Sequence, residues 1–392
     1  MRRGAAHGPK IIRIRTHAIT LPLKESLTSS QLRYRTRETL LVEIEAENGV
    51  TGWGECAGPP VLLAPIVHSF YSDFLLGRDA LQTDRLWHTL RTEGFRWGRR
   101  GLMVAALSGI DMALWDVKGK VLKRPCSEMM GGRAFERVPF YAVGLFFRDR
   151  PETELIPQLI DEAQGYFEQG FRGVKAQIGR NLSFDLALIR RLRENFPNAT
   201  LMADAGHAYD LAEAIQVGNA LADAKFAFQV DPLSPEFPDQ NRILADRVPI
   251  PLYVGKWEQT RWGYQHLLQS GGVACLQLNL AFCGGPTEAL RIRNLAQSFG
   301  INTIPAASGT MLHLAAALHF VTSEFRVPGR LEPTVGMMGW PVTLDPLTAQ
   351  TFADGVTLDH GLASVPPGPG WGVTIHRDRL DAVCVRSQES GL

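Results

Sequence analysis

Short apolar runs recur through the middle of this chain, and they limit its possible folds more than any other feature. Strands of a parallel sheet are buried on both faces and read as continuous apolar runs, while amphipathic stretches between them are typical of covering helices. This alternation predicts a parallel α/β barrel, with a doubly wound open sheet as the competing topology. The runs are 138–144, 173–179, 200–206, 226–232, 250–256, 274–280, 301–307 and 325–332.

A polar residue stands near the end of five successive runs, and the intervals between these residues favour the barrel. They are Lys175, Asp204, Asp231, Lys256 and Asn279, and they follow one another at intervals of 23 to 29 residues. The carboxyl ends of barrel strands converge on one mouth, where barrel enzymes place their active sites. The spacing therefore predicts that these five side chains share one site.

The first third of the chain has a different pattern. Segments 11–20 and 39–47 are predicted strands, and Asn48-Gly49 predicts a hairpin turn into the segment that follows. The stretch 102–121 has a helical pattern that ends before Pro125. We expect a small α+β domain that ends near residue 135.

Charge and cysteine content exclude several classes of function. The chain carries 41 Lys and Arg against 40 Asp and Glu, a net charge of +1, so we expect no nucleic-acid or membrane partner. We see no export signal and no apolar run long enough to span a bilayer. The five cysteines are scattered without a CxxC pair, which argues against a disulfide framework or a structural zinc site. A cytoplasmic protein fits these features best.

Five segments along the chain resemble the enolase superfamily, in its mandelate racemase and muconate lactonizing branch. This resemblance implies an α/β fold, a modified (β/α)7β TIM-like barrel at 136–344. It also implies an α+β capping domain of residues 1–135, completed by 345–392. The segments that carry the resemblance are 108–120 (SGIDMALWDVKGK), 173–176 (GVKA), 201–205 (LMADA), 283–289 (CGGPTEA) and 368–373 (GPGWGV).

The resemblance also implies a chemistry. Family members hold a divalent cation, usually Mg²⁺, with three carboxylates at the ends of the third, fourth and fifth strands. The cation stabilises the enediolate formed when a base removes the proton α to a carboxylate. The expected protein is therefore an isomerase (racemase or cycloisomerase) or a lyase (dehydratase) that acts on a small hydroxy or sugar acid. Relatives commonly assemble as dimers or octamers, so we expect a homo-oligomer.

The base positions of the family are mostly altered here. Lys175 matches the first lysine of the family's Lys-x-Lys pair, but Gln177 stands at the second position and cannot act as a base. Asn279 takes the place of the aspartate on the sixth strand, and Ala306 that of the histidine on the seventh. Glu332 resembles an acid that binds or protonates the substrate carboxylate in some members, with an ion pair to a nearby arginine as its alternative role.

The metal-ligand positions are altered too. Asp204 matches the first ligand and is the only one retained, Val230 stands at the second with Asp231 beside it as a weaker candidate, and Lys256 stands at the third. A fixed ammonium repels a free cation at short distance, so we expect weak metal binding. Our hypothesis is that the Lys256 ammonium takes the cation's place, pairs with Asp204 or Asp231, and permits metal-independent chemistry.

Each candidate also has a simpler interpretation. Lys175 and Lys256 could bind a substrate carboxylate or form a Schiff base, or they could only neutralise inward aspartates. His207, three residues after Asp204, could be a base or a packing histidine. The stretch Ser308-Gly309-Thr310 suits a helix N-cap, whose backbone amides could also hold an anion.

Two classes of function therefore remain open. The first is a divergent enzyme with Lys175, Asp204, Asp231 and Lys256 in its mouth. The second is a non-catalytic descendant that retains a ligand-binding or structural role. By resemblance, substrate specificity lies in capping-domain loops around 21–36 and 53–60.

Overall fold

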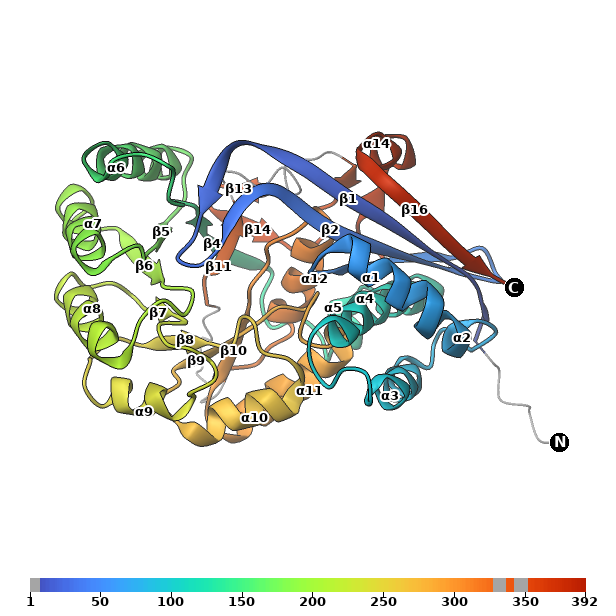
Figure 1. Ribbon diagram of the computed structural model, residues 1–392. Coiled ribbons are helices and arrows are strands. Elements are labelled where there is room, and N and C mark those ends of the chain that lie inside the picture. Colours follow the sequence, from blue (N-terminus) through green and yellow to red (C-terminus); the bar gives the residue numbers. More distant parts are fainter. Residues whose placement is uncertain (1–7, 327–335, 342–351) are drawn as a thin grey trace.

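The computed structural model of the chain describes residues 8–326, 336–341 and 352–392. An antiparallel sheet with its helices lies beside a parallel α/β barrel (Figure 1). The barrel and its capping domain confirm the predicted fold class, and the open-sheet alternative is wrong. Within the described ranges, no helix is both long enough and apolar enough to cross a membrane.

The capping sheet joins the two ends of the chain. Its strand order is β16-β1-β2-β3, all antiparallel, so the last strand lies against the first (Figure 1). Gly49 closes the predicted turn between the second and third strands with φ 78°, a conformation that glycine adopts without a steric penalty. The strands are β1 (Ile11–Thr28), β2 (Arg33–Ala46), β3 (Thr51–Cys56) and β16 (Cys384–Gly391).

The first two strands run further than the sequence pattern predicted. They continue beyond residues 20 and 39 into a long hairpin, with a shift of register between Pro22 and Leu27. The apolar pattern fades there because the hairpin leaves the core: Arg33 and Arg35 are exposed. Part of the predicted specificity loop 21–36 is therefore a pair of extended arms.

Helix α4 lies between the capping sheet and the barrel, and 15 of its 21 residues are buried. It packs on β3 so closely that a Cβ at Gly54 would lie 1.9 Å from the Gly109 carbonyl oxygen, so only glycine fits there. The helix begins and ends close to the predicted bounds. The cap helices are α1 (Pro60–Ile66), a π-helical turn (Val67–Tyr71), α2 (Ser72–Leu75), α3 (Thr83–Gly94), α4 (Leu102–Leu122) and α5 (Cys126–Met129).

Within the described residues, eight parallel strands form the barrel sheet, in the order β10-β9-β8-β7-β6-β5-β4-β11. The first seven predicted strands are confirmed, although the fourth shortens to two residues. Most of the predicted eighth strand, 325–332, lies outside the described residues, and the eighth parallel strand that the structure shows is β11. The strands are β4 (Arg137–Val143), β5 (Gly173–Gln177), β6 (Thr200–Asp204), β7 (Gln229–Val230), β8 (Leu252–Val254), β9 (Cys275–Leu278), β10 (Asn302–Pro305) and β11 (Met338–Pro341).

The helices between these strands start at side-chain caps where the sequence supplies them. Asn181 and Asp210 accept from backbone N–H groups of the first turns of α7 and α8, and Thr310 caps α12 as predicted. The helices are α6 (Glu152–Glu168), α7 (Leu182–Asn195), α8 (Leu211–Asp223), α9 (Asp239–Ala245), α10 (Thr260–Ser270), α11 (Gly285–Ser298) and α12 (Met311–Thr322).

The C-terminal segment returns from the barrel to the cap. Strand β14 pairs with β4 of the barrel, and β16 completes the capping sheet. The division into 1–135, 136–344 and 345–392 stays a prediction, and its boundary at 344 lies outside the described residues. The elements are β12 (Ala353–Asp354), β13 (Leu358–Asp359), β14 (Leu362–Ser364), β15 (Thr374–Ile375) and α14 (Arg377–Val383).

Asp116, on α4, ties the cap to this C-terminal segment. One carboxylate oxygen accepts from the backbone N–H of Trp53 at 2.9 Å and from the Lys120 ammonium at 2.7 Å. The other accepts from the Trp371 N–H at 2.9 Å. The buried Asp116 side chain thus accepts hydrogen bonds from three partners, and we expect it to stabilise the folded protein.

We predict that Asp116→Ala lowers the free energy of unfolding by about 3 kcal/mol, because two buried N–H groups and one ammonium lose their acceptor. Urea unfolding measures the loss. Asp161→Ala, a change at an exposed aspartate, is the control and should cost about 0.5 kcal/mol or less. Equal stability of the two variants would contradict the assigned role.

Candidate active site

The barrel strands bring four of the predicted side chains to one mouth. Lys175 lies in β5, Asp204 ends β6, Asp231 follows β7, and Lys256 lies two residues after β8. These strands are parallel neighbours in the sheet, so their carboxyl ends lie at the same rim. The fold thus brings together four side chains that are spread over 81 positions of the chain, from Lys175 to Lys256.

Asp204 is the centre of this site. Its carboxylate accepts from Lys175 Nζ at 2.8 Å and from Lys256 Nζ at 3.0 and 2.8 Å, the latter two through both oxygens. Burial alone would raise the pKa of the Asp204 carboxyl, but the two ammonium groups outweigh burial and hold this pKa well below its usual range. Asp204 is therefore a permanent anion between two cations.

The two lysines differ in their access to solvent. The Lys175 side chain is 7% exposed, and its ammonium also faces the ring of Tyr141 at 5.9 Å. The Lys256 side chain is 18% exposed. Its ammonium has three N–H donors, and Asp231 Oδ2 at 3.8 Å is too far for a hydrogen bond. Lys256 thus retains a donor that can reach a ligand in the mouth.

Asp231 and His207 form a second pair beside the first. Asp231 Oδ1 accepts from the Gly255 N–H at 3.1 Å, whereas Oδ2 is buried without a hydrogen bond, 3.8 Å from His207 Nε2. His207 Nδ1 lies 2.8 Å from the Leu233 carbonyl oxygen, which can only accept, so Nδ1 carries the hydrogen. Burial raises the pKa of Asp231, and Lys256 and His207 partly offset this rise.

The backbone of the same two residues is strained. His207 and Asp231 have φ values of 67° and 42°, which are unfavourable for residues other than glycine. The His207 N–H donates to the Asp231 carbonyl oxygen at 2.6 Å, so the two loops hold each other in this conformation. Strained residues of this kind cluster at functional sites.

Asn279 is not part of this network. Its Oδ1 accepts from the Ala281 N–H at 3.0 Å and so stabilises its own loop. The other remaining candidate, Glu332, lies outside the described residues.

The floor beneath the mouth is apolar. Val230 packs there with Tyr141, Met202 and Phe228. The Phe228 and Tyr253 rings stack in parallel with their centroids 3.9 Å apart. This floor closes the barrel interior to solvent and lowers the local dielectric around the lysine–aspartate network.

Comparison with known proteins identifies the relatives of this chain. A family model of the mandelate racemase / muconate lactonizing enzyme N-terminal domain matches residues 11–131, and one described as enolase C-terminal domain-like matches 158–379. This chain belongs to the enolase superfamily, in the mandelate racemase and muconate lactonizing branch. The family predicted from the five sequence segments is thereby confirmed.

Curated relatives of this superfamily member are enzymes. D-galactarolactone cycloisomerase from Agrobacterium fabrum is 36% identical over 95% of this chain and 98% of its own length. Arabinonate dehydratase from Saccharolobus solfataricus is 28% identical over 90% of this chain and 92% of its own. These relatives confirm the prediction of an isomerase- or lyase-type enzyme.

Magnesium occurs in this superfamily, but the donors present here do not fit it. A racemase structure from Streptomyces coelicolor with bound magnesium has the same fold, with a TM-score of 0.84 at 24% identity over 96% of this chain and 100% of that one. Here Lys256 donates to both oxygens of Asp204, and Val230 presents only methyl groups. Across residues 8–326, 336–341 and 352–392, no three His, Cys, Asp or Glu side chains form a metal-binding group.

His207 is the residue that the structure adds to the predicted set. Its spacing of three residues from Asp204 was visible in the sequence, but a packing role was the favoured interpretation. Only the fold places its ring beside Asp231, which lies 24 residues further along the chain. A histidine following a strand-end carboxylate was the available signal.

We predict that Asp204→Asn lowers the free energy of unfolding at pH 7 by about 3 kcal/mol, because the buried Lys175 ammonium and the partly buried Lys256 ammonium lose their shared anion. The pKa of Asp204 is lower in the folded than in the unfolded state. Its contribution to the free energy of unfolding is therefore present above about pH 4 and is progressively lost as the pH falls below that value. The stability gap to the wild type should therefore narrow in acid.

Chemical unfolding at pH 7 and pH 3 measures this gap. Asp223→Asn, at an exposed aspartate, is the control and should unfold like the wild type at both pH values. A gap of the same size at pH 3 as at pH 7 would show that the aspartate charge is not its source.

Proposed function

We propose that this protein is an isomerase- or lyase-type enzyme that acts on a sugar acid or its lactone, with the Lys256 ammonium in place of the divalent cation. One observation carries the proposal: Lys256 Nζ lies within 3.0 Å of both oxygens of Asp204, the one retained metal-ligand position. The names of the relatives, a cycloisomerase of a galactarolactone and a dehydratase of arabinonate, support the substrate class.

Lys256 is suited to stabilise negative charge on a substrate oxygen. Asp204 uses two of the ammonium's three N–H donors, and this network fixes the ammonium in place before substrate arrives. A donor held in this way stabilises developing charge without reorganising during the reaction. The apolar floor strengthens the interaction because it keeps water from the opposite side. The substrate carboxylate or lactone carbonyl oxygen is the group it binds.

Proton transfer in this proposal belongs to His207 and Asp231. The Nδ1–H of His207 is fixed by the Leu233 carbonyl, so the neutral ring has its lone pair on Nε2. Asp231 faces that nitrogen with a carboxyl whose pKa is raised by burial. The pair can hold one proton and return it, which α-proton chemistry requires. Gln177 and Ala306 occupy the usual base positions and cannot supply this function.

The state of the cysteines indicates the compartment of the proposed enzyme. All five thiols are free, and four of them are buried. Free thiols suit a reducing compartment, so we propose a cytoplasmic enzyme.

We predict turnover of a sugar acid or sugar lactone that is unaffected by chelator and is lowered at least about 100-fold by Lys256→Met, which removes a charge-stabilising donor. A panel of aldonates, aldarates and their lactones, assayed with magnesium and with EDTA by NMR, measures this turnover. Lys225→Met, at an exposed lysine, is the control and should retain activity.

The outcomes separate the alternatives. Magnesium-dependent turnover would contradict the ammonium's role, and silence across the whole panel would favour a non-catalytic descendant. Activity that survives Lys256→Met would leave the enzyme class intact but assign charge stabilisation to another group.

We predict that Val230→Glu/Lys256→Glu creates a magnesium site, because three carboxylates then end β6, β7 and β8. Isothermal titration with MgCl₂ should show no binding to the wild type and binding to the double variant. The control Val230→Met/Lys256→Met removes the same ammonium without adding carboxylates and should remain silent. Magnesium binding by the wild-type protein would refute the substitution of the cation by lysine.

A further inference from the structure

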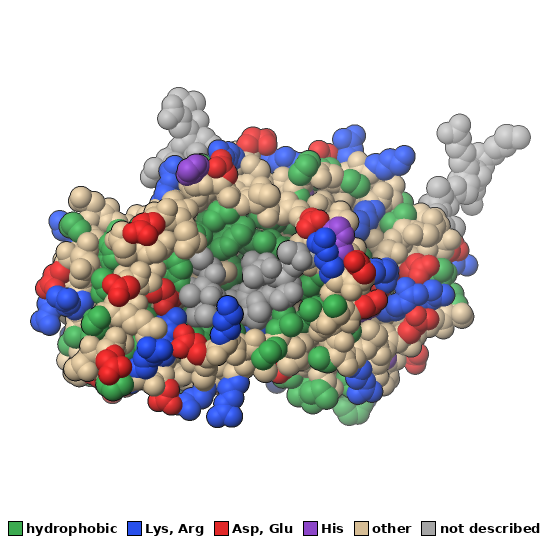
Figure 2. All heavy atoms as spheres, turned by 90° about the horizontal axis from the view of Figure 1, so that it is seen from above, with side chains coloured by type: hydrophobic (Ala, Val, Ile, Leu, Met, Phe, Trp, Pro, Cys, Tyr) green, Lys and Arg blue, Asp and Glu red, His purple; other side chains and the backbone are tan. Residues whose placement is uncertain are grey.

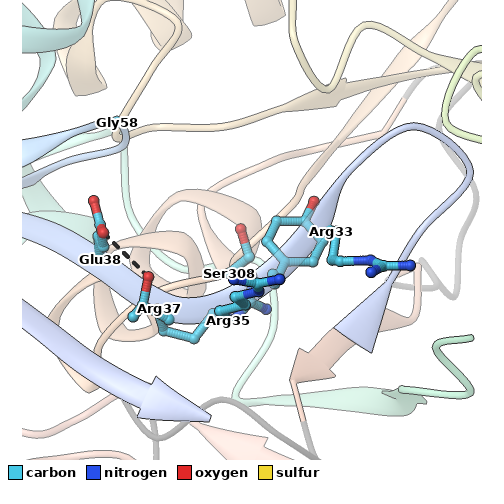
Figure 3. A pocket seen from close by; sticks show the side chains of 8 residues that line it. Arg33, Arg35, Arg37, Glu38, Gly58 and Ser308 are labelled. Atoms are coloured by element: carbon cyan, nitrogen blue, oxygen red, sulfur yellow. Dashed lines mark hydrogen bonds between the residues drawn. The ribbon is translucent and has the colours of Figure 1, made fainter. Parts of the chain in front are cut away.

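A cavity of about 280 Å³ lies along β2, and arginines dominate its wall (Figure 3). Gly58, after β3, and Ser308, after β10, complete the wall from two other segments. A cavity of this size suits part of a small polar molecule. The residues that line it are Arg33, Tyr34, Arg35, Thr36, Arg37, Glu38, Gly58 and Ser308.

This cavity lies at the rim of the barrel mouth. Ser308 belongs to the loop after β10, at the same end of the barrel as Lys256 and Asp204. The residues of β2 that line the cavity, 33–38, are called the arginine segment. At its other end, the hairpin tip is fixed to the loop after β6. Ser30 Oγ donates to the Gly206 carbonyl oxygen at 3.2 Å, and Gln31 Nε2 donates to the His207 carbonyl oxygen at 3.0 Å. The arginine segment therefore extends between loops that border the proposed site.

The wall is built to bind an anion. Its charged members are three arginines and one glutamate, and Glu38 already accepts from Thr36 Oγ1 at 3.1 Å. The Arg33 guanidinium is 4.0 Å from its acidic neighbour, Asp149. No hydrogen bond or ion pair in the described part of the chain uses the side chain of Arg35. Guanidinium groups bind carboxylate and phosphate oxygens through paired N–H donors.

The backbone adds to these donors. Strand β3 pairs with β2 only from Leu40 to Glu45, whereas β1 pairs with the other edge of β2 as far as Arg33. Residues 33–38 therefore present a strand edge beyond the end of β3, and such edges carry outward N–H and C=O groups. A hydroxyl group of a polyhydroxy acid can donate a hydrogen bond to such a C=O group and accept one from such an N–H group.

We infer that the Arg33–Glu38 cavity binds a second anionic group of the substrate, at the end remote from the carboxylate or lactone held by Lys256. The inference rests on the proposed function and narrows it to a sugar acid with two anionic ends. The second anion is a carboxylate in a dicarboxylic sugar acid or a phosphate in a phosphorylated one. Arg35 is the residue that contacts it, and Arg33 adds to the local positive charge.

Binding by the full-length protein tests the inference without requiring turnover. Glucarate and gluconate share a carbon skeleton and differ only in the terminal group, and galactarate and galactonate form a second such pair. Isothermal titration should show the diacid binding at least about tenfold more tightly than the monoacid of one pair, about 1.4 kcal/mol. Arg35→Met should abolish this preference without weakening the monoacid. 6-Phosphogluconate, titrated in parallel, separates phosphate from carboxylate recognition.

Control variants distinguish the two proposals. Arg190→Met removes an exposed arginine on α7, outside the cavity, and should retain the preference, while Arg33→Met should reduce it. Lys256→Met should weaken both acids equally. Diacid preference without turnover would overturn the proposed function alone. Turnover with equal affinity for both acids, a preference unchanged in Arg35→Met, or no binding of any compound would overturn the second anion site.

Discussion

Two lysine ammonium groups share the Asp204 carboxylate in the barrel mouth, and the rest of the site depends on this interaction. A buried carboxylate is stable only when its charge is compensated, and here the compensating cations are side chains of the protein itself: Lys175 and Lys256 form ion pairs with it at 2.8 Å. A cation attached to the chain cannot be removed by a chelator or exchanged for another ion. It also brings hydrogen-bond donors with a fixed direction, which a spherical ion lacks.

The position of this network follows from the parallel barrel. Lys175 and Asp204 lie in β5 and β6 and Lys256 follows β8, and they meet because these strands end at one rim. The aromatic floor around Tyr253 and Phe228 excludes water from below. The hairpin between β1 and β2 contacts the loop after β6, so the capping domain places a basic strand segment beside the mouth. On the face shown in Figure 2, acidic and basic side chains are interspersed, consistent with the net charge of +1.

Periodicity identified the elements whose environment is uniform along their length. The first seven barrel strands and α4 were predictable because most of their residues are buried, and the Asn48-Gly49 turn because few dipeptides suit its backbone. Periodicity failed where the environment changes within an element. The outer halves of β1 and β2 carry polar residues because they extend past the core, and β7 shortens to Gln229 and Val230 within a longer apolar run.

Among the site residues, the alignment of motifs indicated which base and ligand positions had changed. It suggested Lys256 as the replacement for the cation, but no replacement for the lost bases. Val230, Gln177 and Ala306 could be recognised as substitutions from the sequence. The contact between His207 and Asp231 could not, because it joins two loops whose approach depends on unusual φ values at both residues. Asn279 was expected in the shared site, yet its side chain is used by its own loop.

The sequence alone determined the family, the order of the barrel strands and the exchange of a ligand carboxylate for Lys256, because these follow from residue identity and from repeats along the chain. The tertiary structure alone decided that this ammonium binds both oxygens of Asp204, that His207 faces Asp231, and that the arginines of β2 line a cavity. Such contacts depend on distances of a few ångström between segments far apart in the chain, and hydrogen bonds and ion pairs fall off too steeply with distance for residue order to predict them.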